Sequence, residues 1–342
     1  MSDPTNDRKI QHIEIIGSDR DVDRRRFYFD QIRLRHRALP EIAREQVDPS
    51  CLFMGKRLSF PLLISSMTGG NHDVVRTINR NLATAAEQCG VALGCGSQRV
   101  MFTNPEARSS FALREHAPTT LLFANLGAVQ LNYGFTADHC REAVAAVGAD
   151  ALYLHLNPLQ EAVQPEGDTN FADLAARISD VAHNLDVPVV LKEVGAGISP
   201  EDAALLVDTP VRHLDVAGTG GTSWSRIEHH RHADQDDIGL LFQDWGIPTP
   251  LALRLLAPYR DHFTLIASGG IRSGVDMAKA MVLGASLVGL ASPFLKPAMD
   301  SAEAVVAVIE KLRREFLTAM FLLGAHTTGD LLGNDALLLP AF

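Results

Sequence analysis

Residues 263–293 read FTLIASGGIRSGVDMAKAMVLGASLVGLASP. The stretch opens with an apolar, β-branched run, turns at Ser-Gly-Gly into apolar residues at helical spacing, and ends on a second apolar run. Both runs are largely apolar rather than alternating, as expected for parallel strands that are covered on both faces. The stretch therefore predicts a strand–helix–strand unit of an α/β fold.

The same unit recurs along the chain from residue 61 onward. Strands are predicted at 61–66, 91–95, 120–125, 151–156, 188–192, 213–217, 263–268 and 286–290. Helices are predicted at 74–88, 105–115, 137–147, 171–184, 275–283 and 302–323. Because an open doubly wound sheet usually has about five or six strands, eight units in series favour a (β/α)8 TIM barrel over residues 61–342. Residues 1–60 do not fit the repeat and are expected to form an N-terminal extension.

Charge and composition exclude several classes of protein. The chain of 342 residues has 31 Lys and Arg against 41 Asp and Glu, so its net charge of −10 disfavours a nucleic-acid partner. No apolar run approaches the roughly 18 residues that span a bilayer, so no membrane insertion is expected. Cys51, Cys89, Cys95 and Cys140 form no CxxC pair, which disfavours disulfides and structural zinc and favours a cytoplasmic location.

Polar and glycine-rich segments follow the predicted strands, at the end where a TIM barrel builds its active site. They are 66–70 (SMTGG), 96–99 (GSQR), 125–127 (NLG), 155–161 (HLNPLQE), 192–193 (KE), 218–224 (GTGGTSW), 268–272 (SGGIR) and 289–292 (GLAS). The turns after the seventh and eighth strands of a barrel often bind phosphate through backbone N–H groups. Gly269 and Gly270, with Gly220 and Gly221 one strand earlier, therefore predict a phosphate site, although two glycines could also serve only a tight turn.

Lys192 ends a buried strand, where a cation is costly unless it meets an anion or takes part in chemistry. A cation near the N1/O2 edge of a flavin stabilises the anionic reduced form, which links Lys192 to a phosphate-bearing flavin such as FMN. The alternative is a core salt bridge to Glu193 or Asp215. Glu161 is a candidate Mg²⁺ ligand, because Mg²⁺ prefers one or two carboxylates plus substrate phosphates; the alternative is a solvated loop carboxylate.

The histidines need separate interpretations. Residues 222–250 form a long polar segment that contains His229, His230 and His232. Its acid-rich composition favours a solvated surface loop over a metal site, and residues 229–237 receive no role. His155 ends an apolar strand and is expected to bond either a ligand or a neighbouring backbone group.

Together, these motifs resemble the type 2, FMN-dependent isopentenyl-diphosphate isomerases over nearly the whole chain. Besides the strand-end segments, the resemblance rests on Arg8-Lys9 followed by His12, on the Gln160-Glu161 pair, and on Trp224 with Glu228. It implies interconversion of isopentenyl and dimethylallyl diphosphates with reduced FMN and Mg²⁺. It also implies NADPH as the reductant and a homo-oligomer, a tetramer or octamer.

The resemblance also implies particular site residues. FMN would be held by Ser66, Met67, Thr68, Ser97, Asn125, Lys192, Thr222, Gly270, Ile271, Arg272, Ala291 and Ser292. The substrate would be bound by Arg8, Lys9, Ser97, Gln98, Arg99, Asn157 and Gln160. Mg²⁺ would be held by Glu161, and the catalytic group would comprise Gln160, His155, Trp224 and Glu228. Residues 1–60 would thereby contribute to the substrate site.

Protonating an unactivated alkene is difficult, and no side chain in this set is a strong acid near neutral pH. We therefore expect the reduced flavin to carry the acid–base work, with Gln160 positioning or relaying the proton. An α-hydroxyacid oxidase would need a His in the segment 268–272, and an IMP-dehydrogenase-like enzyme would need a Cys near 222–224; the sequence has neither. A non-catalytic flavin- or phosphate-binding barrel stays compatible with the sequence.

Overall fold

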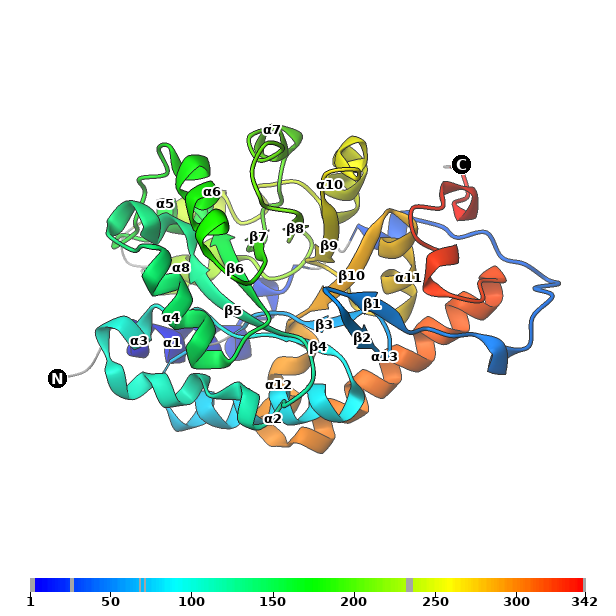
Figure 1. Cartoon of the computed structure of the whole chain (residues 1–342), viewed down its shortest axis with the longest axis horizontal. Coiled ribbons are helices and arrows are strands. Elements are labelled where there is room, and N and C mark those ends of the chain that lie inside the picture. The colour runs from blue at the N-terminus through cyan, green and yellow to red at the C-terminus, as the bar shows by residue number, and fades with distance from the viewer. Residues whose placement is uncertain (1–3, 25–27, 68, 71, 232–235, 341–342) are drawn as a thin grey trace.

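Eight parallel strands close into a barrel in the computed structural model of the chain (Figure 1). The structure describes residues 4–24, 28–67, 69–70, 72–231 and 236–340, with the backbone alone over 4–10. The barrel strands are β3 (Leu62–Ile64), β4 (Ala92–Gly94), β5 (Leu122–Gly127), β6 (Ala151–Leu156), β7 (Val189–Glu193), β8 (His213–Asp215), β9 (Thr264–Ser268) and β10 (Ala285–Leu290). Each strand pairs with the next along the chain, and β10 closes the barrel on β3. The predicted TIM barrel and all eight of its strands are confirmed.

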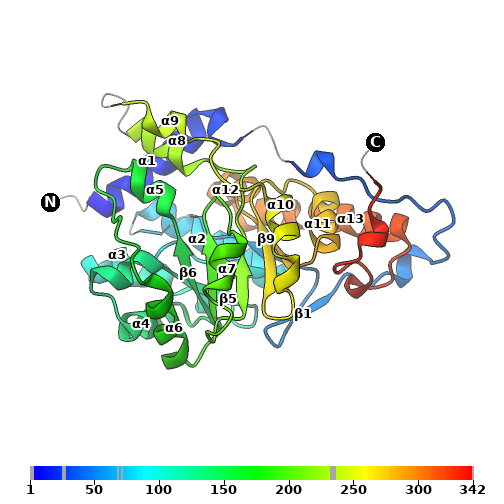
Figure 2. The same cartoon turned by 90° about the horizontal axis from the view of Figure 1, so that it is seen from above.

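Helices surround this barrel, as the view from above shows (Figure 2). The longer ones are α2 (Asp73–Cys89), α4 (Ala137–Val147), α6 (Leu174–Asn184), α11 (Gly274–Val282), α12 (Ser292–Asp300) and α13 (Ala302–Leu323). The shorter ones are α3 (Val100–Thr103), α5 (Pro158–Val163), α7 (Pro200–Ala204), α8 (Trp224–Arg231), α9 (Ile238–Leu241) and α10 (Thr249–Leu255). Capping signals set their limits: the Ser301 hydroxyl accepts the Ala304 N–H at the start of α13, and Gly324 ends α13 in the left-handed conformation. None of the described helices is both long and apolar enough to cross a bilayer.

Three predicted segments differ in the structure. Residues 105–115 form the 3₁₀ helices η4 (Pro105–Phe111) and η5 (Leu113–Glu115) instead of an α-helix. The hydroxyls of Ser109 and Ser110 bond to carbonyl oxygens three residues earlier, which supports the tighter winding. Helix α6 begins three residues after the predicted start because Asp173 is left-handed, with φ of 54°. The segment 222–250 is not simply a loop, since it contains α8 and α9.

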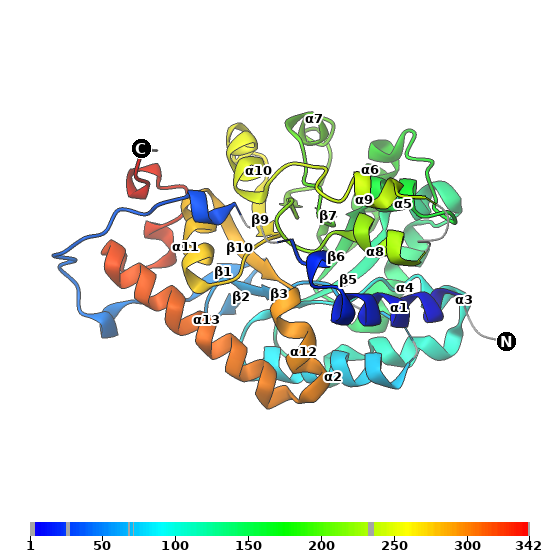
Figure 3. The same cartoon turned by 180° about the vertical axis from the view of Figure 1, so that it is seen from behind.

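The N-terminal residues cover both ends of the barrel. Strands β1 (Cys51–Phe53) and β2 (Lys56–Leu58) form an antiparallel hairpin, whose Phe53 and Leu58 are buried against the barrel interior. There they join Phe123 and Tyr153, whose rings stack 4.8 Å apart. At the opposite end, helix α1 (Pro4–Ser18) lies beside α8, where the chain enters the fold (Figure 3). The hairpin therefore seals one end, and the functional groups must gather at the other.

Candidate active site

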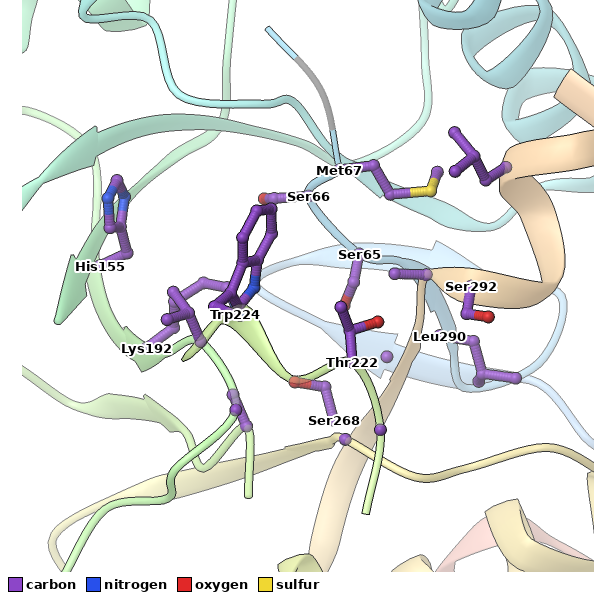
Figure 4. Close-up of a pocket in the computed structure, with 18 of the residues that line it drawn as sticks. Ser65, Ser66, Met67, His155, Lys192, Thr222, Trp224, Ser268, Leu290 and Ser292 are labelled. Atoms are coloured by element: carbon purple, nitrogen blue, oxygen red, sulfur yellow. The ribbon is translucent and has the colours of Figure 1, made fainter. Parts of the chain in front are cut away.

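One pocket lies at the carboxyl end of the barrel, and every barrel strand contributes to it, either through its carboxyl-terminal half or through the segment that follows it. Figure 4 shows His155 and Lys192 on one side of this pocket, Leu290 and Ser292 on the other, and Trp224 and Thr222 between them. The sequence-predicted residues that line it are Ser66, Met67, Ser97, Asn125, His155, Gln160, Lys192, Thr222, Trp224, Gly270, Ile271, Arg272, Ala291 and Ser292. The fold thus brings most of the predicted cofactor and catalytic residues into one cavity.

Glycines shape the part of the pocket after β8 and β9. Gly269 and Gly270 are left-handed, with φ of 96° and 77°. A Cβ on Gly269 would overlap the Gly218 carbonyl oxygen, and a Cβ on Gly270 would lie 2.9 Å from the carbonyl carbon of Gly220. The Thr249 hydroxyl fixes the same turn by donating to the carbonyl oxygens of Ser268 and Gly269, at 2.9 and 2.7 Å. Only glycine suits these positions, and the exposed backbone can approach a phosphate closely.

Two serine hydroxyls of the pocket fit a polar cofactor. Ser65 and Ser66 line the cavity after β3, and neither buried Oγ atom has a hydrogen-bond partner among the described residues. Buried polar atoms usually have partners, so these two are suited to a ligand with polar atoms of its own. With the glycine turns and the Lys192 cation, they match the chemistry of FMN, which combines a polar ring edge with a phosphate.

Lys192 both lines the pocket and forms a buried ion pair. Its Nζ lies 3.3 Å from Asp215 Oδ2, donates to the Glu193 carbonyl oxygen over 3.0 Å, and sits 5.5 Å from the Tyr153 ring centre. The Asp215 carboxylate is fully buried and also accepts from Ser268 Oγ at 2.6 Å. The core salt bridge that was the alternative to a ligand-binding role is therefore formed, with Asp215 as the partner. Lys192 nevertheless lines the cavity.

His155 is held by the strand next to its own. Its Nδ1 donates to Asn125 Oδ1 over 2.8 Å, and the Asn125 amide donates to the Cys95 carbonyl oxygen over 3.1 Å. Gln98, predicted to meet the substrate, is fully buried, and its amide joins the Asn125 N–H to the Ala143 carbonyl oxygen. Gln98 therefore supports Asn125 from behind, outside the residues that line the pocket.

Gln160 and Glu228 meet across the pocket wall. Gln160 Nε2 donates to Glu228 Oε1 over 2.8 Å, and Gln160 Oε1 accepts from Asn157 Nδ2 at 3.3 Å. Glu228 is buried between His12, whose Nε2 lies 3.2 Å away, and the Arg231 guanidinium. Burial alone would raise the pKa of Glu228, but His12, the Gln160 amide and Arg231 outweigh it and lower that pKa to about 2. Glu228 is therefore an anion at neutral pH that fixes the Gln160 amide.

Glu161 and Arg99 belong to a second cluster beside α5. The buried Glu161 carboxylate accepts from Asn157 Nδ2 at 2.8 Å, from Gln164 Nε2 at 3.1 Å and from the Asp168 N–H at 2.7 Å. Arg99 Nη1 pairs with Asp168 Oδ2 at 2.8 Å. Glu161, the predicted Mg²⁺ ligand, thus contacts the backbone N–H of Asp168, and Arg99, predicted to bind the diphosphate, contacts its carboxylate. The interpretation of Glu161 as a solvated loop carboxylate is wrong, because the residue is 7% exposed.

The N-terminal helix adds residues that the sequence did not single out as pocket groups. His12, Ile13 and Ile16 line the cavity, and the His12 ring meets Trp224 edge-on with centres 5.2 Å apart. The predicted substrate residues Arg8 and Lys9 lie on the same helix, within the part described by its backbone alone. Thr68 lies outside the described residues. The apolar spacing of Ile13 and Ile16 is a usable signal, but only the fold shows which surface they cover.

The histidines of α8 serve its packing. His230 Nε2 lies 2.6 Å from Asp19 Oδ2, and Arg226 Nε donates to the same oxygen over 2.6 Å. These contacts join α8 to the end of α1. Among the described residues, no group of three His, Cys, Asp or Glu side chains gathers for a metal. His232 lies outside the described residues, whereas His230 and Arg231, whose Nε donates to Gln11 Oε1 over 3.2 Å, hold the N-terminal segment against α8.

Sequence comparisons give consistent results. The sequence profile of FMN-dependent dehydrogenases matches residues 106–337. An isopentenyl-diphosphate delta-isomerase of Paracoccus zeaxanthinifaciens is 56% identical over 337 residues, which cover 97% of this chain and 96% of that protein. An isopentenyl-diphosphate delta-isomerase of Hydrogenovibrio crunogenus is 52% identical over 343 residues, covering 99% of this chain and all of that protein.

Solved structures resemble the fold at lower sequence identity. A flavocytochrome b2 variant with sulfite bound aligns with a TM-score of 0.69 at 19% identity, covering 97% of this chain and 82% of that one. A mandelate oxidase variant aligns with a TM-score of 0.63 at 20% identity, covering 96% of each chain. At this level of identity the likeness shows the barrel fold alone.

Proposed function

Because this chain belongs to the isopentenyl-diphosphate delta-isomerases, within the wider family of FMN-dependent dehydrogenases, we propose that it interconverts isopentenyl and dimethylallyl diphosphates. The reaction moves a carbon–carbon double bond: one carbon gains a proton, another loses one, and no net electron transfer occurs. The observation that carries the proposal is the meeting of Gln160, His155, Lys192 and Trp224 in one cavity of a chain with full-length isomerase relatives. A site for this reaction must bind a diphosphate and shield an apolar alkene from water.

We propose that FMN binds between the glycine turns after β8 and β9 and the serines after β3. Lys192 and Asn125 would hold the flavin ring, and Gly270, Arg272 and Ser292 would hold the phosphate. When bound, reduced FMN would supply the acid–base group for the proton shift, because none of the proposed site side chains is a strong acid near neutral pH. The buried ion pair with Asp215 keeps the Lys192 cation in place at the pocket wall.

Gln160 would position the proton that moves to or from the alkene. Its amide is fixed on one side by Glu228 and on the other by Asn157, so its orientation is set before substrate binds. Trp224 and Ile13 would supply the apolar surface that excludes water from the hydrocarbon. His155, oriented by Asn125, would complete the wall as a hydrogen-bonding group.

Glu161 would contribute the protein's carboxylate to Mg²⁺. A carboxylate oxygen suits this hard cation, and Mg²⁺ commonly takes its remaining ligands from phosphates and water. Arg99, with Arg8 and Lys9 of the N-terminal helix, would neutralise the rest of the diphosphate charge. Replacing Glu161 with Gln should raise the Mg²⁺ concentration needed for half-maximal rate at least tenfold while leaving FMN content unchanged. An unchanged requirement would contradict this assignment.

We propose three further properties: NADPH as the reductant, a cytoplasmic location, and a homo-oligomer, either a tetramer or an octamer. Exposed apolar side chains support the assembly, since Leu205, Leu241 and Trp245 are 68%, 80% and 63% exposed in the single chain. The molecular mass in solution, measured by light scattering, tests it. The mass of one chain, 37.1 kDa, would contradict the oligomer.

The central experiment is an anaerobic incubation of the protein with isopentenyl diphosphate, Mg²⁺, FMN and NADPH, followed by product analysis. Dimethylallyl diphosphate should form only when the flavin is reduced, and without stoichiometric consumption of NADPH. A parallel reaction reduced with dithionite separates the role of NADPH from that of the reduced flavin. Protein that carries FMN but gives no product in either reaction would indicate a non-catalytic flavin barrel and overturn the proposal.

A further inference from the structure

A short N-terminal segment, residues 20–24, is paired with the loop after β8; we call it the N-terminal strap. The Ser223 N–H donates to the Val22 carbonyl oxygen over 2.8 Å, and the Arg24 N–H donates to the Gly221 carbonyl oxygen over 3.2 Å. Asp23 is thereby aligned antiparallel to Thr222, one of the pocket residues. The buried Arg24 side chain reaches the loop after β7, where its Nη1 donates to the Gly195 carbonyl oxygen over 3.1 Å. The strap is therefore fixed beside the pocket.

The strap directs one carboxylate to the predicted phosphate-binding loops. Asp23 Oδ1 accepts from Arg272 Nη2, and Asp23 Oδ2 accepts from Ser292 Oγ at 3.1 Å. Arg272 follows β9, and Ser292 follows β10 as the first residue of α12. One carboxylate oxygen thus takes a donor from the loop after β9, and the other takes a donor from the loop after β10, the two loops that bind phosphate in many barrels. Both donors line the pocket.

A carboxylate and a phosphate require the same kind of donor. Both are anions that bind a guanidinium and a hydroxyl through oxygen, and two anions on one cation repel each other. We propose that Asp23 competes with the phosphate of FMN for Arg272 and Ser292, so that cofactor loading and seating of the strap oppose each other. The inference rests on the proposed function, since it needs the FMN phosphate at these two residues.

The competition has a reciprocal consequence. If the strap weakens phosphate binding, then phosphate must weaken the strap by the same factor, because binding free energies are linked. The loosening is local, since helix α1 keeps its own anchors: Asp19 to Arg226 and to His230, and His12 to Glu228. The strap would therefore set how tightly FMN is held without releasing the helix that carries Arg8 and Lys9.

The test compares Asp23→Asn with Asp21→Asn, a control on the same strap. Both variants remove one negative charge, but the Asp21 side chain is 53% exposed and pairs with Arg226, at 3.9 Å, whereas Asp23 contacts the pocket residues Arg272 and Ser292. The apoproteins are titrated with FMN and with riboflavin, which lacks the phosphate, and flavin fluorescence gives the dissociation constants. Asp23→Asn should bind FMN at least tenfold more tightly and riboflavin within twofold of wild type. Asp21→Asn should change neither constant more than twofold.

A second measurement reads the strap itself. FMN, but not riboflavin, should speed hydrogen exchange at the amides of Arg24 and Ser223 in the wild-type protein. Equal or weaker FMN binding by Asp23→Asn would overturn the competition and make Asp23 a support for Arg272, while leaving the flavin site intact. A wild-type protein that binds neither flavin would instead overturn the proposed function, so the two failures are distinguishable.

Discussion

The Gln160 side-chain amide donates to Glu228 over 2.8 Å and so joins the segment after β6 to helix α8, 68 residues later in the chain. Glu228 has neighbours on every side: His12 from α1, Gln160 from α5 and Arg231 from its own helix. A single buried carboxylate thus connects the N-terminal helix, the pocket wall and α8. The orientation of Gln160 depends on all three elements being in place.

Replacing Gln160 with Met, which has a similar length but no amide, should lower kcat by about 10² to 10⁴, the usual contribution of a positioned proton-transfer group. The flavin absorbance of the purified variant should match that of the wild type, because the proposed FMN contacts lie elsewhere in the pocket. Steady-state kinetics with isopentenyl diphosphate measures the effect. An unchanged kcat would rule out a relay role for Gln160.

Glu228 should make the free energy of unfolding depend on pH in the acidic range. Its pKa is lowered from 4.5 to about 2 in the fold, so its ionised form stabilises the native state above pH 4.5, and this contribution is lost as the pH falls through about 2. Glu228→Gln lacks that contribution. The difference in unfolding free energy between wild type and variant should therefore shrink by up to about 3 kcal/mol between pH 6 and pH 2. Urea unfolding across this range would show a constant difference if Glu228 did not titrate as described.

Gly269→Ala should destabilise the protein and weaken FMN binding. Gly134→Ala is a matched control, because Gly134 has φ of 95° against 96° for Gly269 but has no atom within 4 Å of the position that a Cβ would take. The left-handed backbone alone should cost about 1 to 2 kcal/mol in both variants. The overlap with the Gly218 carbonyl oxygen should add to this cost at Gly269 only. Equal losses of stability and of FMN affinity would show that the turn after β9 tolerates a side chain.

Lys192→Met should leave the buried Asp215 carboxylate without its cation, a loss that typically costs about 3 to 5 kcal/mol. The double variant Lys192→Met with Asp215→Asn should recover part of that stability, because the uncompensated charge is gone. Neither variant should retain FMN as tightly as the wild type. Denaturant unfolding of the two single variants and the double variant measures the coupling. Strictly additive losses would mean that the two charges do not interact in the fold.

The barrel could be predicted from sequence because its strands are short, nearly continuous apolar runs followed by glycine or polar turns. Strand β7 illustrates this: Val189–Glu193 is buried throughout, and only its last two residues are charged. A Lys at the end of such a run is so unfavourable without a partner that the sequence indicates either a pocket or a buried ion pair there, and the structure has both. The glycine pair after β9 is informative for the same reason, since position in the barrel gives it a meaning that the dipeptide alone lacks.

The contacts that the sequence could not supply join segments far apart in the chain. Asp23 meets Arg272 across 249 residues, and no local pattern distinguishes it from the other acids of a charged N-terminal stretch. Gln98 shows that a local pattern can also mislead. Its place in the strand-end segment 96–99 predicts that it binds the substrate, whereas its side chain donates to the Ala143 carbonyl oxygen of α4. Residues 222–237 are mostly polar in sequence, and helix α8 within them depends on a few buried side chains such as Ile227.

The hairpin β1–β2 closes one end of the barrel and so makes the two ends of the barrel different. Phe53 and Leu58 cap an interior filled by Phe123, Tyr153 and Ile266, so this end of the barrel is closed, and the pocket of the described residues lies at the other end. When one end of a pocket is closed, a molecule bound near that end can leave only after any molecule bound above it has left. Under the proposed function, a diphosphate that binds above FMN would therefore have to leave before FMN can.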